Sequence, residues 1–543
     1  MSKRDAIDVF SNKFAHDIFK QKYSMNGQET WADTCRRVTD AVCSQLLDTN
    51  SKEKIYKFML DRKFIPGGRY LYSCGRSFHQ VNNCFLFKAE DTREGWADLM
   101  QKSTSALLTG GGIGIDYSNI RYKGASIKRT GGVCTGPISL MEMVNEAGRH
   151  VMQGGQRRSA IWAGLNWAHK DIKDFMICKN YGEDLKVLKE KDLTFRLPME
   201  LTNISVIYDT NFFIAIENSK HEQHKEAMDV WLSNCRQAFS TAEPGMSFNF
   251  CRDSESLRNA CTEVVSEDDS DKCNLGTVWM NRCSDKEEFA EVVKYSTMFL
   301  LCGGIYSDVP TDKIKEIGLR NNRIGLGLGG MHEWLMLRGH KYACVPELHK
   351  WLATYKRESD SAAFIGAKQL GVAVPKGVRA IAPTGTIGII AETTTGIEPL
   401  FCKSYKRRYF KDNKWMYQYV VDGAVKRLLD KGVRMEDIQD SYDISFTERV
   451  KFQADVQQYV DMAISSTCNM PAWGSEDNSE ITLKKNATVL LRYAKRLRGF
   501  TVYPDGCRNG QPLTRATLEE ALANEGLVYE ERETECLNGV CGL

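Results

Sequence analysis

The spacing of apolar and polar residues separates an N-terminal part from the rest of the chain. From Asp5 to Lys63, charged and apolar positions recur at helical spacing, and this pattern stops at the breaker Pro66-Gly67-Gly68. We therefore expect a helical N-terminal region over residues 1–65.

The middle of the chain has a different pattern. From Arg69 to about Pro512, short β-rich runs alternate with longer helical stretches; examples of such runs are Cys84–Phe87, Ile204–Ile207 and Val378–Ile381. This alternation predicts an α/β domain with parallel strands over residues 66–512. Residues 514–524 look helical and acidic, and the last dozen residues have no periodic pattern. We expect residues 513–543 to form a C-terminal tail.

Composition narrows the class of protein. The 543 residues carry a net charge of only +3, with charges of both signs interspersed, so no strong field favours nucleic acid or an acidic membrane as a partner. The N-terminus lacks the apolar core of a signal peptide, and no apolar run approaches the roughly 18 residues of a membrane span. These features predict a cytoplasmic protein that binds neither nucleic acid nor membranes.

The eighteen cysteines are scattered, without the short spacings of a secreted disulfide scaffold. No Cys-x-x-Cys pair occurs, and His221-Glu-Gln-His224 misses the zinc spacing His-Glu-x-x-His. We expect reduced thiols, mostly buried as small apolar side chains, and no protein-bound metal.

One pentapeptide carries candidate chemistry. Asn259-Ala-Cys261-Thr-Glu263 places a thiol between an amide and a carboxylate at alternate positions, so that in an extended segment all three side chains face one way. Alone, this pattern favours a polar turn with a buried cysteine. Further cysteines change that balance, because Cys84 opens a β-like run and Cys273 opens Cys-Asn-Leu-Gly.

The chain also ends with a pair of thiols, Cys536 and Cys541. Two thiols on a terminal segment suit dithiol exchange, since they can reach a buried disulfide and then an external reductant. The alternative is that these cysteines are incidental. It is the weaker interpretation, because exposed paired thiols are a liability without a redox use.

Taken together, these residues resemble the ribonucleotide reductase family from about Pro66 to the C-terminus. The resemblance implies a ten-stranded α/β barrel with Cys261 on a loop inside it, where burial would protect a thiyl radical from water. By the same resemblance, the Cys261 radical takes the 3′-hydrogen of the ribose. Glu263 is then the general base on the 3′-hydroxyl, and Asn259 hydrogen-bonds the sugar.

The resemblance also assigns the remaining cysteines. Cys84 and Cys273 would be the reducing pair that protonates the departing 2′-hydroxyl and ends as a disulfide. Cys536 and Cys541 would reduce that disulfide and then be recharged by a thioredoxin-like or glutaredoxin-like protein.

A substrate-phosphate loop is expected where Pro and Gly turns precede an apolar run. Residues 382–388 read Ala-Pro-Thr-Gly-Thr-Ile-Gly, which suits a loop that leads into a helix N-terminus, although any tight turn could have this composition. With the resemblance, the expected substrate-binding residues are Asn83, Gly112, Pro383, Thr384, Gly385, Thr386 and Ile387.

A second nucleotide site, for deoxynucleotide or ATP effectors, is implied by the resemblance of residues 91–96, 109–121 and 154–160 to the family's specificity region. The expected effector-binding residues are Asp91, Thr92, Arg93, Arg121, Lys128, Arg157 and Arg158. The alternative is a solvated helix start followed by surface charges.

The source of the radical distinguishes classes within the family, since a thiyl radical needs a cofactor or a partner. Near the C-terminus only Tyr503 is present, without the neighbouring tyrosine of the metal-dependent class, and the features of the glycyl-radical class are missing. The pattern around Tyr503 resembles the adenosylcobalamin-dependent class. A catalytic subunit that receives its radical from a metal-containing partner is the main alternative, and a nucleotide-binding regulator without catalysis is a weaker one.

Two further features bear on assembly and substrate. Only six residues separate Cys84 from Asp91, which leaves no room for the inserted domain of the monomeric, triphosphate-reducing branch, so we expect a homodimer. Both triphosphate and diphosphate substrates stay open, and no ATP-cone is expected before Pro66. Finally, Gly325-Leu-Gly327-Leu-Gly-Gly330 satisfies GxGxxG, but no buried strand precedes it, so we interpret these glycines as close packing within a barrel.

Overall fold

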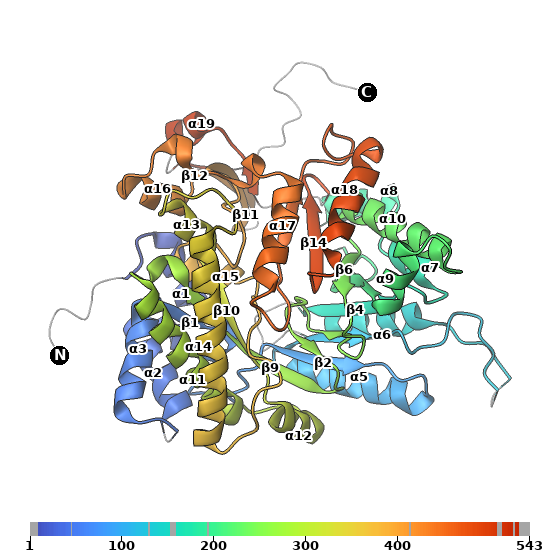
Figure 1. The fold of residues 1–543 in the computed structure, drawn as a ribbon, viewed down its shortest axis with the longest axis horizontal. Helices are drawn as coiled ribbons and strands as arrows, with labels where there is room; N and C mark the ends of the chain where they lie inside the picture. Colours follow the sequence, from blue (N-terminus) through green and yellow to red (C-terminus); the bar gives the residue numbers. More distant parts are fainter. Residues whose placement is uncertain are drawn as a thin grey trace.

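A computed structural model describes residues 9–44, 46–128, 131–151, 159–192, 195–411, 414–507, 513–524 and 527–530. Within these residues, no helix is both long enough and apolar enough to cross a membrane. Figure 1 shows the chain as a sheet-centred body with helices packed around it.

The N-terminal region is helical, as predicted. It consists of α1 (Lys13–Lys22), α2 (Trp31–Cys43) and α3 (Thr49–Leu60). Each helix begins at a polar cap, and at α2 the Thr30 and Asp33 side chains form a reciprocal capping box. Their buried residues, with Phe19 and Trp31, belong to one core with α11 (Lys286–Tyr306) and α14 (Pro346–Leu370), in which α2 and α3 pack against α11 (Figure 1).

Five parallel strands form one half of a barrel. They are β2 (Cys84–Lys88), β3 (Gly112–Asp116), β4 (Ile161–Asn166), β5 (Thr202–Tyr208) and β6 (Gly245–Phe248). The helices between them are α5 (Arg93–Leu108), α6 (Pro137–Arg149), α7 (Ile172–Ile177), α8 (Glu183–Lys191), α9 (Thr210–Glu217) and α10 (His224–Thr241). This half confirms the predicted alternation of strands and helices.

The second half runs antiparallel to the first. Its strands are β9 (Asp271–Trp279), β10 (Ile324–Gly329), β13 (Thr467–Met470) and β14 (Gly499–Pro504), with β9 antiparallel to β2 and β14 antiparallel to β6. Between β10 and β13, the predicted strand 378–381 pairs only through the bridges Leu326–Arg379 and Ile381–Ile464. With that segment the ring has ten members, which confirms the predicted barrel.

Short elements complete this half. They are β1 (Phe64–Pro66), which extends the sheet beside β9, and α4 (Gly68–Ser73), α12 (Asp312–Asn321), α13 (Met331–Met336), α15 (Gly385–Ala391), α17 (Phe446–Gln457) and α18 (Glu480–Ala494). The glycine-rich run forms β10 itself: a Cβ on Gly325 would lie 2.3 Å from Leu275, and one on Gly327 would lie 2.8 Å from the Ala380 carbonyl oxygen. The interpretation as close packing is confirmed.

A narrow hairpin enters the barrel. It is formed by β7 (Leu257–Arg258) and β8 (Val265–Ser266), and its tip is residues 259–264. On one side, a Cβ on Gly114 of β3 would lie 1.8 Å from the Arg258 carbonyl oxygen, so only glycine fits there. On the other side, the Ala463 N–H donates to the Glu263 carbonyl oxygen at 2.9 Å. The tip therefore bridges the two halves of the barrel.

A separate antiparallel sheet has the order β15 (Leu513–Arg515), β11 (Ser404–Lys411), β12 (Lys414–Val421) and β16 (Val528–Glu530). It packs with α16 (Gly423–Asp430) and α19 (Leu518–Ala523). The described part of the expected C-terminal tail is thus folded, with the predicted helix shortened to α19. Three-residue strands that pair with partners about a hundred residues earlier leave no local periodicity to detect.

Candidate active site

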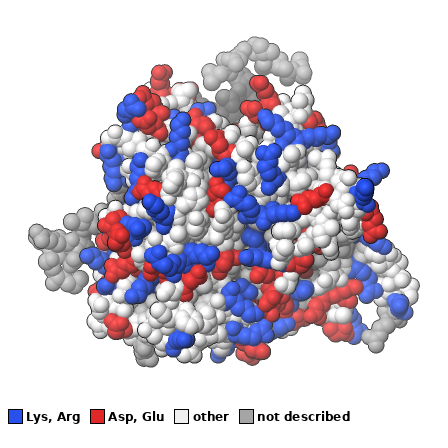
Figure 2. All heavy atoms as spheres, in the orientation of Figure 1, with Lys and Arg blue, Asp and Glu red and all other residues white. Residues whose placement is uncertain are grey.

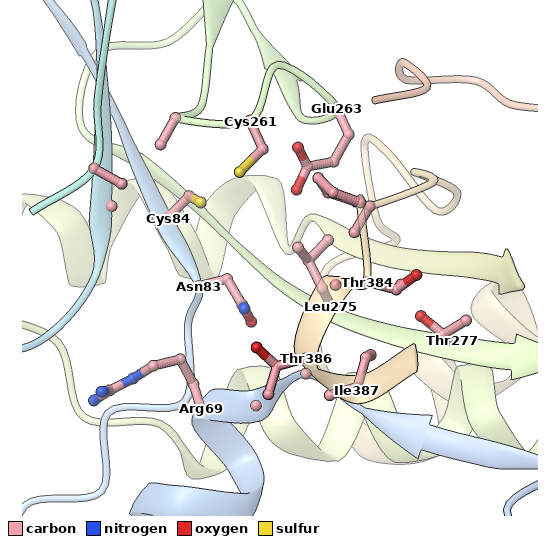
Figure 3. A pocket seen from close by; sticks show the side chains of 18 of the residues that line it. Arg69, Asn83, Cys84, Cys261, Glu263, Leu275, Thr277, Thr384, Thr386 and Ile387 are labelled. Atoms are coloured by element: carbon pink, nitrogen blue, oxygen red, sulfur yellow. The ribbon is translucent and has the colours of Figure 1, made fainter. Parts of the chain in front are cut away.

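A cavity lies between the hairpin tip, the first residues of β2 and β3, strand β9 and the loop before α15 (Figure 3). Its lining residues are Tyr23, Gly67, Gly68, Arg69, Asn83, Cys84, Gly110, Gly112, Ala160, Ala260, Cys261, Glu263, Leu275, Gly276, Thr277, Ala382, Pro383, Thr384, Gly385, Thr386 and Ile387. The structure therefore brings together all seven expected substrate-binding residues, along with Cys84, Cys261 and Glu263.

The hairpin tip is a tight turn and not the extended segment that would place three alternate side chains on one face. Thr262 has a φ of +69°, and the Thr262 N–H donates to the Asn259 carbonyl oxygen at 3.0 Å. The extended interpretation was wrong because the left-handed residue reverses the chain. Cys261 and Glu263 still line the cavity, whereas Asn259 lies behind them and is not among the lining residues.

Asn259 links the other groups of the tip. Its side-chain amide donates to Cys84 Sγ at 3.1 Å, its carbonyl oxygen accepts from the Val264 N–H at 3.0 Å, and its side chain also hydrogen-bonds Glu263. Asn259 is fully buried. In this arrangement the amide fixes the positions of one thiol and one carboxylate.

Glu263 is buried at the cavity wall. Burial raises the pKa of its carboxyl group to about 7, and the hydrogen bonds from Asn259 and from its own N–H offset that rise only in part. Its Oε2 atom has no hydrogen-bond partner among the described residues. A carboxyl group with this pKa can exchange a proton at neutral pH.

Cys84 and Cys273 are directly opposed on β2 and β9. Opposed residues of antiparallel strands have Cα atoms about 4.5–5.5 Å apart, which is a separation that a disulfide can span. Both cysteines are buried, and burial raises the pKa of each thiol well above its usual value. At neutral pH they are therefore protonated thiols that can donate hydrogen.

Cys261 is exposed and lines the cavity, which corrects the expectation that it is buried. The reason is its place at the tip of a turn that projects into the cavity. Figure 3 shows Cys261, Glu263 and Cys84 grouped together. Cys536 and Cys541 lie outside the described residues.

The opposite wall of the cavity suits an anion. Helix α15 begins at Gly385, and its first backbone bond runs from the Gly388 N–H to the Thr384 carbonyl oxygen at 2.6 Å. The N–H groups of residues 385–387 precede that bond and have no partner within the helix. The buried Thr384 Oγ1 has no partner among the described residues, and a Cβ on Gly385 would meet open space. These donors fit a phosphate group.

Several lining residues were not predicted as site residues. Gly67 and Gly68 belong to the breaker Pro66-Gly67-Gly68 and Arg69 follows it, and a Cβ on Gly67 would lie 2.7 Å from Asn83 Oδ1. The double glycine was therefore a usable signal for a close approach. Tyr23 comes from the N-terminal helical region, where nothing in the local sequence indicates a contact with the barrel.

The described effector residues lie away from the cavity, beyond the carboxyl ends of β2 and β3. Arg121 Nε bonds Asp91 Oδ2 at 2.7 Å, Thr92 caps α5 through the Gly95 N–H, and Arg93 pairs with Glu94 on the surface. Lys128 is exposed. The other two expected residues, Arg157 and Arg158, lie outside the described part of the chain.

Surface charge and possible metal ligands add little to the description of this site. On the face in Figure 2, basic and acidic side chains are intermixed. Among the described residues, no group of three or more His, Cys, Asp or Glu side chains could hold a metal ion.

Comparisons with known proteins identify the family of the chain. Residues 82–348 and 376–503 match the family described as ribonucleotide reductase, barrel domain. The chain is 25% identical to the vitamin B12-dependent ribonucleoside-diphosphate reductase of Mycobacterium tuberculosis, over 90% of this chain and 76% of that protein. It is also 25% identical to the protein of the same name from Thermoplasma acidophilum, over 86% of this chain and 67% of that protein.

Among solved structures, the class Id ribonucleotide reductase alpha subunit of Actinobacillus ureae has a similar fold, with a TM-score of 0.72 and 14% sequence identity. The match covers 91% of this chain and 97% of that chain. At this identity the likeness concerns the fold alone.

Proposed function

Since the chain belongs to the ribonucleotide reductase family through its barrel domain, we propose that it converts ribonucleotides to 2′-deoxyribonucleotides by thiyl-radical chemistry that depends on adenosylcobalamin. The observation that carries the proposal is the single cavity wall formed by Cys261, Glu263 and Cys84, with Cys273 opposite Cys84. The net reaction consumes one ribonucleotide and two thiols, and yields one deoxyribonucleotide, one water and one disulfide.

The roles follow from the state of each group. The Cys261 sulfur faces the cavity and, as a thiyl radical, takes the 3′-hydrogen of the substrate ribose. Glu263 then accepts the proton of the 3′-hydroxyl, for which a pKa of about 7 is suitable. The Asn259 amide holds Cys84 and Glu263 in place and is our proposed ligand of the sugar once substrate enters.

Cys84 and Cys273 supply the reducing equivalents. Because burial keeps both thiols protonated, one can donate a proton to the departing 2′-hydroxyl, which leaves as water. The pair ends as a disulfide across β2 and β9. Cys536 and Cys541 are proposed to reduce it by thiol exchange and to be recharged by a thioredoxin-like or glutaredoxin-like protein.

The exposure of Cys261 fits the proposed cofactor, adenosylcobalamin. Cys261 is exposed, so a bulky group that must touch the sulfur can reach it. Adenosylcobalamin, when bound, supplies the radical that converts the Cys261 thiol to a thiyl. The names of the two relatives, from Mycobacterium tuberculosis and Thermoplasma acidophilum, also support this cofactor.

The nature of the substrate follows from the same names and from the anion-binding wall. Both relatives are named as ribonucleoside-diphosphate reductases, so we propose diphosphates as the first substrates to test and triphosphates as the second. The phosphates would lie against the N–H groups of residues 385–387 and the Thr384 hydroxyl.

Regulation is proposed at the carboxyl ends of β2 and β3. There a bound deoxynucleotide or ATP would replace the contact between Asp91 and Arg121 with its own contacts to these residues. Val133, which precedes α6, and Met143, on α6, expose apolar side chains. Their exposure supports a homodimer through this face. Sedimentation with and without deoxynucleotides tests that assembly.

The decisive assay offers the eight common ribonucleoside di- and triphosphates to the purified chain with a small dithiol, with and without adenosylcobalamin. We expect deoxyribonucleotides only when the cofactor is present. Activity that needs a metal-containing partner protein and ignores the cofactor would favour the main alternative, a subunit that receives its radical from another chain. Binding of nucleotides without any turnover would favour a regulator.

A further inference from the structure

The carboxyl end of α15, away from the proposed phosphate contacts, is held by a buried cluster that the proposed chemistry does not use. Glu392 Oε1 accepts hydrogen bonds from the Ser11 N–H at 2.9 Å, the Ser11 hydroxyl at 2.8 Å and the Asn12 N–H at 3.0 Å. Its Oε2 pairs with Arg62 Nη1 at 2.7 Å, and only 2% of the Glu392 side chain is exposed. The cluster ties α15 to the N-terminal region.

The backbone at this position makes the choice of residue informative. Glu392 ends α15 with a φ of +53°, in the left-handed region that glycine adopts most easily. A glycine would fit this turn, yet the chain places a carboxylate there that accepts four hydrogen bonds. A side chain kept at a strained position is a reason to look for its use.

Other groups hold the same end of the helix. Arg62 Nη1 also donates to the Ile390 carbonyl oxygen at 2.9 Å, its Nη2 donates to the Val9 carbonyl oxygen at 2.7 Å, and Arg282 donates to the Ala391 carbonyl oxygen. Cations at the last carbonyls of a helix stabilise it. Because α15 has only seven residues, a displacement at Ala391 is passed on to Gly385 at its other end.

The N-terminal region also reaches the cavity directly. Tyr23 lines it, and a Cβ on Gly68 would lie 2.7 Å from the Tyr23 hydroxyl. The same region therefore contacts the cavity wall at Tyr23 and the far end of α15 at Ser11 and Asn12.

We propose that Glu392 is a positioning residue: by joining α15 to Ser11, Asn12 and Arg62, it fixes the loop Pro383–Ile387 in the geometry that receives the substrate phosphates. This inference rests on the proposed function. It concerns binding of the phosphate group and assigns Glu392 no part in the radical steps.

The test uses the full chain and measures binding of cytidine diphosphate and of cytidine by calorimetry, together with KM and kcat for cytidine diphosphate. Glu392→Gln removes the charge, and Glu392→Gly removes the carboxylate while it relieves the backbone. We expect both variants to bind cytidine diphosphate about tenfold more weakly, with KM raised in proportion and kcat within about twofold of the unchanged chain. Binding of cytidine should not change.

The matched control is Glu29→Gln. Glu29 forms a comparable pair with Arg37 at 2.6 Å within the N-terminal region. Arg37 also donates to the Tyr23 carbonyl oxygen at 3.4 Å, but the pair has no hydrogen bond to α15, so the loss of Glu29 should lower stability and leave KM unchanged. If Glu392→Gln does not fold, Ser11→Ala decides, because it removes one donor and keeps the Arg62 pair; a smaller rise in KM is then expected.

Two results would overturn the inference: binding of cytidine diphosphate that is unaltered in the folded variants, or equal weakening for cytidine and its diphosphate. Failure of the unchanged chain to bind any ribonucleotide would instead contradict the proposed function itself.

Discussion

The two ends of strands β2 and β3 hold their polar groups in opposite states. At the amino ends, the Asn83 and Glu263 side chains are at the cavity wall, and each has a buried oxygen without a partner among the described residues. Beyond the carboxyl ends, Asp91 and Arg121 are partly exposed and paired with each other. One strand pair thus connects a preorganised cavity to a surface whose polar groups are already satisfied.

This difference has an energetic meaning. A buried polar group without a partner costs about 1–3 kcal/mol, so such groups persist where a ligand or a reaction uses them. A partly exposed ion pair contributes only about 0–1 kcal/mol and can exchange partners at little cost. The cavity is therefore suited to chemistry, and the carboxyl ends are suited to reversible binding of an effector.

The largest expected effect is at Cys261. Cys261→Ser should abolish deoxyribonucleotide formation, with a loss of at least about 10⁴-fold, because a hydroxyl cannot replace the thiyl radical. The assay uses a small dithiol, so that the C-terminal cysteines are not required. Cys251→Ser alters another exposed cysteine and serves as the control, with activity expected to be unchanged. Retained activity in Cys261→Ser would show that the reaction does not take place at this cavity.

The next effect is at Glu263, where we expect Glu263→Gln to lower kcat by about 10²–10⁴-fold. In the unchanged chain, kcat/KM should rise with pH through about 7 as the carboxyl group becomes the unprotonated base. The variant should lack that rise. A pH profile that is the same in both proteins would exclude Glu263 as the base.

The same substitution, Glu263→Gln, should raise the stability of the protein although it lowers kcat. Because the folded pKa of Glu263 is raised to about 7 from an ordinary 4.5, its ionisation costs stability that grows between those two pH values. At pH 8, Glu263→Gln should therefore be more stable than the unchanged chain, by up to about 3 kcal/mol, and the gain should vanish near pH 4.5. Thermal melts at the two pH values measure it.

A narrower effect is expected for the C-terminal cysteines. The double change Cys536→Ser and Cys541→Ser should stop turnover driven by a thioredoxin-like protein, while a small dithiol that enters the cavity still supports it. Both reductants are compared on the same preparation. An equal loss of turnover with both reductants would mean that Cys536 and Cys541 affect the cavity in a way other than by transferring reducing equivalents.

The smallest effect is expected at the effector surface. Arg121→Ala should weaken the response of substrate preference to added deoxynucleotides, and it should leave the free energy of unfolding almost unchanged, since the pair with Asp91 is partly exposed. Rates for several substrates, with and without deoxynucleotides, provide the readout. An unaltered response would locate effector binding elsewhere.

The sequence predicted the features that depend on local pattern. The alternation of runs predicted an α/β domain with parallel strands, and the absence of a strand before Gly325 correctly separated the glycines of β10 from a dinucleotide site. The helical N-terminal region, which forms α1 to α3, followed from the spacing of charged and apolar residues.

Other features depend on contacts between distant segments. The opposition of Cys84 and Cys273 arises from strands that are far apart in the chain, and Tyr23 reaches the cavity only because the N-terminal helices pack on the barrel. The exposure of Cys261 follows from the left-handed turn at Thr262, a conformation that is uncommon for threonine. None of these could be read from spacing alone.

The central claim is that the Cys261 sulfur takes the 3′-hydrogen of the substrate. The most direct test compares the turnover of cytidine diphosphate carrying hydrogen or deuterium at the 3′-carbon, with adenosylcobalamin and a small dithiol. We predict slower turnover of the deuterated substrate, and no product with Cys261→Ser. Deoxycytidine diphosphate formed at equal rates from both substrates, with Cys261→Ser still active, would contradict the account.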